Sequence, residues 1–222
     1  MEKTAIDQRH SVRRYLPKEL EDRHHFELLK FIDSLNRESG LNFKLVVRDK
    51  RAFGTRLARY GKFEDVSNYI VIKGKRGKDF AKRCGYYGEK AVIFAQSLGL
   101  NSCWVGLHYK KNKKTFEILS GEKLCCVIAI GYGRNSGAKR RCKTVEQVSN
   151  YTQGMPKWFL SGVESALKAP TAINRQAFYF ELINENEVKL KTKWGPFYNT
   201  DFGIVKYHFE VGAGKENFTW KG

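Results

Sequence analysis

Apolar residues recur along the chain with two different spacings, one typical of helices and one typical of strands. Steps of three and four residues predict four longer helices, at Phe26–Leu35, Phe80–Leu98, Trp158–Leu167 and Asp201–Val211. In the first of these, Phe26, Leu29, Ile32 and Leu35 form the expected apolar face. Short runs rich in β-branched and aromatic residues predict strands, at Phe43–Val47, Tyr69–Ile72, Ser102–Val105, Leu124–Ile130, Phe178–Ile183, Val188–Lys191 and Asn217–Lys221.

The segments between these elements are expected to form short helices or irregular structure. Residues 1–15 are expected to form a short helix that carries RHSVRRY at its end, and another short helix is expected around Phe116–Leu119. The basic stretch Arg48–Lys62 is expected to be irregular. Helices and strands that alternate without a strict βαβ order predict an α+β fold.

The order of elements occurs twice. A helix, two strands, a helix and a strand are followed by the same order, and the pairs Gly88/Gly203 and Trp104/Trp220 each lie about 115 residues apart. Coincidence among common elements is the alternative. We favour a degenerate duplication, which predicts a single unit over residues 1–222 with two pseudo-equivalent halves, about 1–150 and 151–222.

Charge brings in a second class of function. Lys and Arg number 41 and Asp and Glu 23, a net charge of +18, which suits a polyanion-binding surface. The basic clusters are spread over the chain, however, and no helix-turn-helix, zinc-finger or RNP pattern accompanies them. A solvated surface is therefore the preferred interpretation, and we expect no nucleic-acid partner. Only Lys139-Arg140-Arg141 is assigned to a site.

Other classes are excluded more directly. The longest apolar run, Leu124–Ile130, is too short to cross a bilayer, and MEKTAIDQRH contains no apolar signal region. We therefore expect a cytoplasmic protein without a membrane partner. The five cysteines form no CxxC pair and the histidines show no ligand spacing, so no metal site is predicted. No nucleophile–base pair is visible, which indicates that any catalysis relies on a cofactor.

Four segments carry candidate chemistry. Arg9, Ser11 and Arg13 alternate in RHSVRRY and would project together from an extended backbone, as a cradle for phosphate. APTAINRQAFYF brings small residues and amides to the start of a strand, where they could line a flat ligand. GEKAVIFAQSLGLNSCWVG leads a helix into a strand that ends at Gly106, and AIGYG precedes the basic KRR cluster.

Together these four segments resemble the nitroreductase family of flavoproteins. RHSVRRY is similar to its opening Arg-x-Ser-x-Arg/Lys signature, and APTAINRQAFYF to its Pro-Ser-x-x-Asn-x-Gln-Pro-Trp segment. Because the latter lies late in this chain, the arrangement resembles the single-chain branch called putative TM nitroreductases. The resemblance implies a central, mostly antiparallel sheet flanked by helices, and one chain that supplies what two subunits supply in typical members. It would allow the chain to act as a monomer.

The resemblance also implies a cofactor and its contacts. FMN would pass hydride from NAD(P)H to a nitroaromatic or quinone-type acceptor, with no catalytic side chain. Phosphate contacts would come from Arg9, Ser11, Lys139 and Arg141, and Arg13 would lie near the pyrimidine edge. The N–H of Gly106 would approach the reactive nitrogen N5. The full set of expected cofactor contacts is Arg9, His10, Ser11, Arg13, Val105, Gly106, Lys139, Arg141, Pro170, Thr171, Ala172 and Asn174.

Two other functions stay open. Ala177 and Phe178 replace the family's Pro-Trp, so a flavin- or nucleotide-binding protein without turnover is one alternative. A basic polyanion-binding protein is the other.

Overall fold

The computed structural model describes residues 1–138 and 140–221 of the chain. Its internal contacts divide it into two compact units. Unit 1 comprises Met1–Asp7, Ala81–Glu89 and Arg140–Gly222, and unit 2 comprises Gln8–Phe80 and Lys90–Lys139. Helix α4 (Phe80–Ser97) contributes residues to both. The units do not follow the sequence halves about 1–150 and 151–222, and the duplication stays a prediction.

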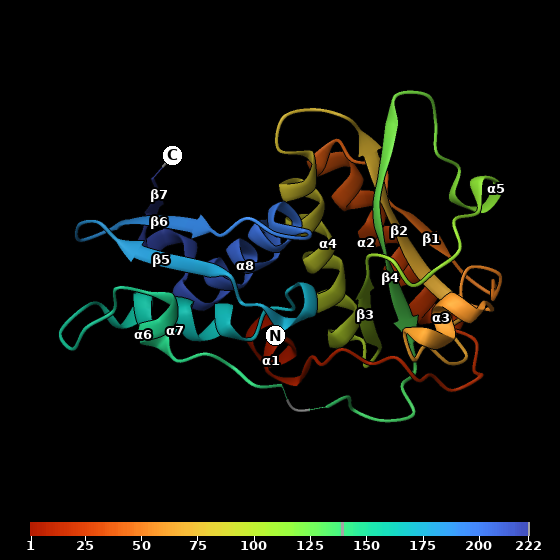
Figure 1. Ribbon diagram of the computed structural model, residues 1–222, viewed down its shortest axis with the longest axis horizontal. Helices are drawn as coiled ribbons and strands as arrows, with labels where there is room; N and C mark the ends of the chain where they lie inside the picture. Colours follow the sequence, from red (N-terminus) through yellow and green to blue (C-terminus); the bar gives the residue numbers. More distant parts are fainter. Residues whose placement is uncertain (139, 222) are drawn as a thin grey trace. The chain divides into compact units, whose positions relative to one another are not determined.

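Unit 2 is built on a four-stranded antiparallel sheet, drawn in orange to green in Figure 1. Its order is β1-β2-β4-β3, with β1 Lys44–Val46, β2 Asn68–Lys75, β3 Asn101–Val105 and β4 Glu122–Gly131. The register of β2 against β4 shifts at Ile72/Lys73. Helices α2 (Asp22–Ser39), α3 (Arg56–Tyr60) and α5 (Lys113–Phe116) belong to the same unit.

The core of unit 2 lies on the buried central strands. Strand β2 is buried over Asn68–Gly74, so its run of apolar residues has no polar face. One side of the sheet carries a cluster of rings, in which Tyr69 packs edge-on to Phe116 with 5.9 Å between centroids. Such rings bury large apolar areas in preferred tilted geometries. This core anchors β3, the strand on which one group of candidate site residues depends.

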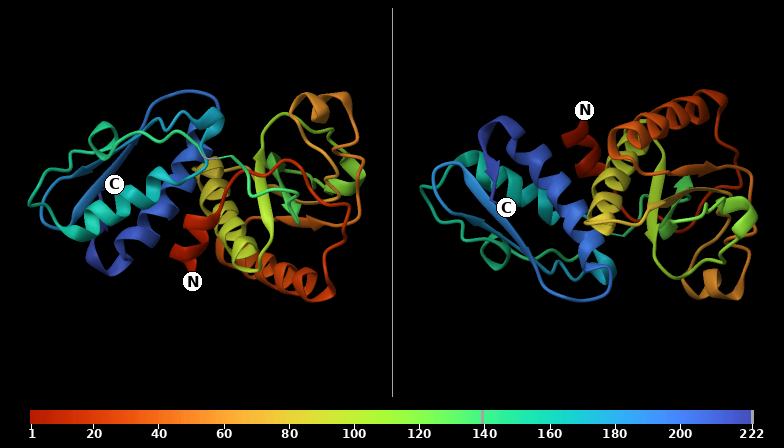
Figure 2. Two further views of the ribbon diagram at one scale, coloured as in Figure 1. Left: turned by 90° about the horizontal axis from the view of Figure 1, so that it is seen from below. Right: turned by 90° about the horizontal axis from the view of Figure 1, so that it is seen from above.

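Unit 1 combines a small sheet with a helix pair. Strands β5 (Phe178–Leu182) and β6 (Glu187–Thr192) form an antiparallel hairpin, and β7 (Thr219–Trp220) adds to β6 in parallel. Helices α7 (Lys157–Leu167) and α8 (Tyr198–Ala213) run side by side (Figure 2). The remaining elements are α1 (Glu2–Gln8), α6 (Val145–Val148), η1 (Ala172–Asn174) and η2 (Lys215–Asn217). Phe180 of β5 stacks on Phe209 of α8 at 4.4 Å, which joins sheet to helices.

Most predicted elements are present, including the four longer helices and all seven strands. The expected α+β fold with an antiparallel sheet is confirmed. Gly40 ends α2 in the left-handed region at φ 65°, as its position after the apolar pattern indicates. The short helix expected around Phe116–Leu119 lies earlier, at Lys113–Phe116, because the Asn112 side chain caps it by accepting the Thr115 N–H.

Three expectations were wrong. Helix α1 ends at Gln8, so RHSVRRY is not helical. The apolar face of α2 is built on Leu28, Ile32 and Leu35, while Phe26 and Leu29 are exposed. A face read at strict three-residue steps drifts around a helix that has 3.6 residues per turn. Arg48–Lys62 contains α3, which the Thr55 side chain caps by accepting the Ala58 N–H.

Candidate functional site

The segment after α1 is extended and pairs with β3. The Val12 N–H donates to the Ser102 carbonyl oxygen at 3.0 Å, and Ser11 and Ser102 form a parallel bridge. The buried Tyr15 hydroxyl donates to the Val12 carbonyl oxygen at 2.8 Å and fixes the next turn. Backbone in this conformation sends alternate side chains to the same side. Arg9, Ser11 and Arg13 are thereby separated from Val12, which is buried in the core.

All three alternate residues act on the thiol of Cys103, the central residue of β3. Burial raises the pKa of Cys103, whereas the positive charges of Arg13 and Arg9 and a hydrogen bond with Ser11 act to lower it. Arg9 is only 2% exposed, while Arg13 is exposed with its guanidinium 5.9 Å from the centre of the Phe63 ring. Guanidinium and hydroxyl groups that alternate along one extended segment form a donor set suited to phosphate or another anion.

The neighbouring predicted residues border this group. His10 is half-buried, and its Nδ1 lies 3.0 Å from the Gln8 carbonyl oxygen. A Cβ on Gly137, which has a φ of 82°, would lie 2.7 Å from the Cβ of His10, so the loop after β4 passes close to RHSVRRY. Val105 is the last residue of β3 and is buried, and Gly106 follows it directly. All these residues belong to unit 2.

The remaining predicted residues belong to unit 1 and form a second group. The Asn174 side chain donates to the Arg141 carbonyl oxygen at 2.8 Å, which joins the basic cluster to the turn at residues 170–176. Arg140 donates to the Ala169 carbonyl oxygen at 3.0 Å, at the end of the stretch that follows α7. Pro170, Thr171 and Ala172 are half-buried and Asn174 is exposed. Lys139 lies outside the described residues.

The turn at residues 170–176 has an unusual backbone. Ile173, Asn174 and Gln176 have φ values of 48°, 56° and 46°. Non-glycine residues adopt this region rarely, and a β-branched residue such as isoleucine does so at a cost. Gln176, which is 3% exposed, holds the turn through its side-chain amide. Its Nε2 donates to the Arg141 carbonyl oxygen at 3.0 Å, and its Oε1 accepts the Lys143 N–H at 2.9 Å.

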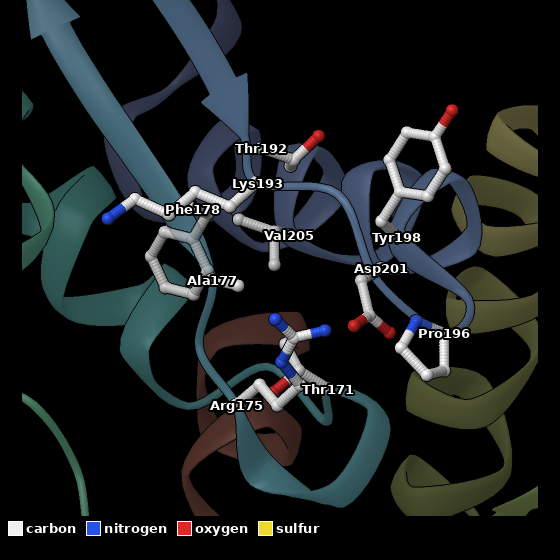
Figure 3. A pocket seen from close by; sticks show the side chains of 10 residues that line it. All are labelled: Thr171, Arg175, Ala177, Phe178, Thr192, Lys193, Pro196, Tyr198, Asp201 and Val205. Carbon is white, nitrogen blue, oxygen red and sulfur yellow. The ribbon is translucent and has the colours of Figure 1, made fainter.

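A pocket opens beside this turn, lined by Thr171, Arg175, Ala177, Phe178, Thr192, Lys193, Pro196, Tyr198, Asp201 and Val205 (Figure 3). The Asp201 carboxylate and the Arg175 guanidinium both point into it. Both oxygens of Asp201 lie 3.1 Å from the Ala172 nitrogen and accept its N–H. Burial raises the pKa of Asp201 to about 7, although the Ala172 N–H and the charge of Arg175 favour the ionised form.

Sequence reasoning missed Asp201 and the structural role of Gln176. The polar and apolar pattern marks Asp201 only as the first residue of an expected helix, and it marks Gln176 as one of the amides that could line a ligand. Their roles depend on hydrogen bonds to residues 29 and 35 positions away, for which the chain carries no local signal.

Two classes of site are not seen. Within residues 1–138 and 140–221, no group of three histidine, cysteine or acidic side chains could hold a metal ion. Over the same residues, no helix is long and apolar enough to cross a membrane. The five cysteines are free thiols.

Comparison with known proteins agrees with the resemblance inferred from the motifs. The model of the family described as "Putative TM nitroreductase" matches residues 3–213. A putative nitroreductase from Thermotoga maritima has a similar structure, with a TM-score of 0.68 and 20% identity over 97% of this chain and 84% of that one. No curated protein matches the chain.

Smaller nitroreductases share the fold over about two thirds of the chain. An FMN-dependent nitroreductase from Clostridium difficile matches with a TM-score of 0.50 and 18% identity, over 69% of this chain and 97% of its own. A putative nitroreductase in complex with FMN, from Desulfovibrio desulfuricans, matches with a TM-score of 0.51 and 17% identity, over 70% and 98%.

Proposed function

Because the chain belongs to the family described as "Putative TM nitroreductase", we propose that it is an FMN-dependent oxidoreductase. Its reductant would be NADH or NADPH, and its acceptors nitroaromatic or quinone-type molecules. The observation that carries the proposal is the pairing of the extended segment with β3 at Ser11 and Ser102, from which Arg9, Ser11 and Arg13 act on the Cys103 thiol. Two solved structures of similar fold are an FMN-dependent nitroreductase and a nitroreductase in complex with FMN, which supports the choice of cofactor.

The residues of unit 2 fit the phosphate and ring of FMN. Arg9 and Ser11 would bind the phosphate, because a buried guanidinium is held in place and loses little freedom when it binds an anion. Arg13 is exposed and can reach a ligand, so we assign it to the pyrimidine edge. Val105 and Gly106 would supply main-chain contacts near N5, because glycine has no side chain to obstruct the approach of the flavin ring.

The residues of unit 1 form a second set of proposed contacts. The turn that Gln176 fixes carries four of them, Pro170, Thr171, Ala172 and Asn174. The fifth, Arg141, accepts a hydrogen bond from the Asn174 side chain with its carbonyl oxygen. Small side chains at Thr171 and Ala172 suit a flat ring. Lys139 is proposed as a phosphate contact from the sequence resemblance alone.

The FMN that these residues would hold would supply the hydride-transfer chemistry between NAD(P)H and the acceptor. The chain's own residues would bind the phosphate, orient the ring and hold positive charge beside it. Positive charge from Arg13 would favour the reduced, anionic flavin. No side chain is assigned as a general base. We also propose that the two half-repeats correspond to the two subunits of a typical dimer, so that a single chain can act as a monomer. The protein is further proposed to be cytoplasmic.

An absorbance spectrum tests the proposal first. Purified protein is mixed with FMN, desalted and scanned, and we expect flavin bands that co-elute with the protein. The loaded protein should then oxidise NADH or NADPH in the presence of a nitroaromatic or a quinone. Arg9→Gln should lose most of the retained flavin, whereas Ser97→Ala, a change at the exposed end of α4, serves as the matched control.

The possible results separate the three functions. Retained flavin without oxidation of either nicotinamide would support a binding protein without turnover. Protein that retains no flavin would contradict the proposal. Binding of nucleic acid that weakens steeply with salt would instead favour the polyanion-binding alternative.

A further inference from the structure

We infer that Asp201 is a positioning residue, which holds the turn at residues 170–176 in the conformation that binds FMN. This inference rests on the proposed function, because Thr171, Ala172 and Asn174 are proposed flavin contacts. Asp201 itself is not assigned to contact the flavin. It acts through Ala172, whose N–H it accepts with both carboxylate oxygens at 3.1 Å.

The turn needs external support. Three of its non-glycine residues, Ile173, Asn174 and Gln176, lie in the left-handed region, and such residues persist there only where the surrounding structure imposes the conformation. Ile173 is 87% exposed, so side-chain packing does not hold it. Hydrogen bonds constrain the turn instead, both at Ala172 and Gln176 and through the side chain of Asn174.

One end is held by Gln176 and the other by Asp201. The Gln176 N–H donates to Thr171 Oγ1 at 3.0 Å, and the Gln176 amide fixes the turn to Arg141 and Lys143. At Ala172 the partner is Asp201, which reaches back across 29 positions from the first turn of α8. Loss of the Asp201 contact would remove the hydrogen bonds to the Ala172 N–H, and Ala172 and the adjacent Thr171 are both proposed flavin contacts.

The position of Asp201 is rigid because α8 is closely packed at this point. A Cβ on Gly203 would lie 1.9 Å from the Lys82 carbonyl oxygen, and a Cβ on Gly85 would lie 2.0 Å from the Thr200 carbonyl oxygen. Backbones this close leave α8 no room to shift against α4 within unit 1. The carboxylate therefore offers a fixed acceptor, and the geometry of the turn follows from it.

The charge on Asp201 changes near neutral pH, which supplies a readout. Burial raises its pKa to about 7, and Arg175 faces it from the turn. Lys193, from the segment after β6, and Tyr198 line the same pocket, while Lys82 of α4 is directed to the Phe202 ring. An ionised carboxylate is a stronger acceptor than a neutral one. The hydrogen bond from the Ala172 N–H to Asp201 should therefore weaken as pH falls through 7.

The test compares Asp201→Asn and Asp201→Ala with the control Glu185→Gln, a change at an exposed residue of the β5–β6 connection. FMN dissociation constants are measured from pH 5.5 to 8.5. At pH 8 we expect Asp201→Ala to bind FMN about tenfold more weakly than the wild type and Asp201→Asn about threefold more weakly. The dissociation constant of Asp201→Asn divided by that of Glu185→Gln should approach one below pH 6. The titration of the flavin phosphate affects both dissociation constants equally and therefore cancels in this ratio.

Amide exchange of Ala172 is measured on the same proteins without flavin. We expect faster exchange in Asp201→Ala, while Asp201→Asn, which removes a buried charge and keeps the shape, should melt no lower than the wild type. A loss of flavin affinity without a loss of stability separates positioning from a structural role. If Asp201→Ala does not fold, the pH profile of Asp201→Asn carries the test.

Failure of the inference differs from failure of the proposed function. Wild-type protein that binds FMN, with both Asp201 variants equal to the control, would overturn the inference and leave the function standing. Wild-type protein that retains no FMN would contradict the function and, with it, a flavin-positioning role. Ala172 exchange would then show whether Asp201 holds the turn for another purpose.

Discussion

His208 Nε2 lies 2.8 Å from Glu89 Oε1, and neither side chain has any solvent exposure. His208 Nδ1 lies 3.1 Å from the Ser165 carbonyl oxygen, which can only accept a hydrogen bond. Nδ1 therefore donates to that oxygen, and Nε2 forms the second hydrogen bond of the ring, with Glu89. The pair connects α4, α7 and α8 inside unit 1 without using any residue proposed to bind flavin.

We expect the loss of either partner to destabilise unit 1. Removing one member of a buried hydrogen-bonded pair takes a partner from the other, so His208→Leu and Glu89→Leu should each lower the free energy of unfolding by roughly 1–3 kcal/mol. The double variant should lose less than the sum of the two. Urea unfolding measures all three, with His25→Leu on α2 as the control. Additive losses would contradict a direct interaction.

Gly203 provides a second prediction about the same unit. A Cβ there would lie 1.9 Å from the Lys82 carbonyl oxygen, a backbone atom that cannot turn aside. Gly203→Ala should therefore lower the free energy of unfolding by about 3 kcal/mol, since overpacked positions force the backbone to move. Gly77→Ala is the control, because nothing lies within 4 Å of its added Cβ. Equal melting temperatures for the two variants would show that the helices can separate without cost.

The Lys73–Glu122 pair in unit 2 predicts a pH dependence. Their side chains are 2% and 5% exposed, and Lys73 Nζ lies 3.2 Å from Glu122 Oε2. Burial acts to raise the pKa of Glu122, but hydrogen bonds from Asn42, the Leu119 N–H and Lys73 outweigh it and the pKa is lowered. A lowered pKa stabilises the folded state above the ordinary value of 4.5, and this stabilisation is lost as pH falls below it.

Glu122→Gln should therefore unfold more easily than the wild type at pH 7, and the difference should shrink as pH falls below 4.5. Chemical unfolding at a series of pH values measures it, with the exposed Glu185→Gln as the control. A difference that stays constant from pH 7 to pH 3 would show that the charge of Glu122 does not stabilise the fold.

These residues show what the sequence can predict. The periodicity located α4 and α8, because a repeated apolar face is a local property. It did not predict that Glu89 would pair with His208, 119 positions later, since polar residues on apolar faces carry no mark of their partners. Lys73 begins the basic segment Lys73–Arg83, one of the clusters interpreted from the sequence as a solvated surface, but its burial depends on the distant Glu122. Alternation in RHSVRRY predicted the grouping of Arg9, Ser11 and Arg13, provided that the backbone was extended.

Arg13 offers the sharpest test of the proposed flavin site. Its guanidinium is exposed above the Phe63 ring and acts on Cys103 through its positive charge, so a substitution should not disturb the core. Arg13→Glu should weaken FMN binding roughly tenfold to a hundredfold, because a repulsive charge replaces a charge-assisted contact. It should also lower the reduction potential of the bound flavin, since a negative charge disfavours the anionic reduced form.

Arg13→Gln should have a smaller effect in the same direction. Arg23→Glu on the exposed face of α2 changes net charge equally and serves as the control. Equal affinities and potentials in Arg13→Glu and Arg23→Glu would place Arg13 away from the flavin, whereas a graded series from arginine to glutamine to glutamate would assign the effect to charge at that one position.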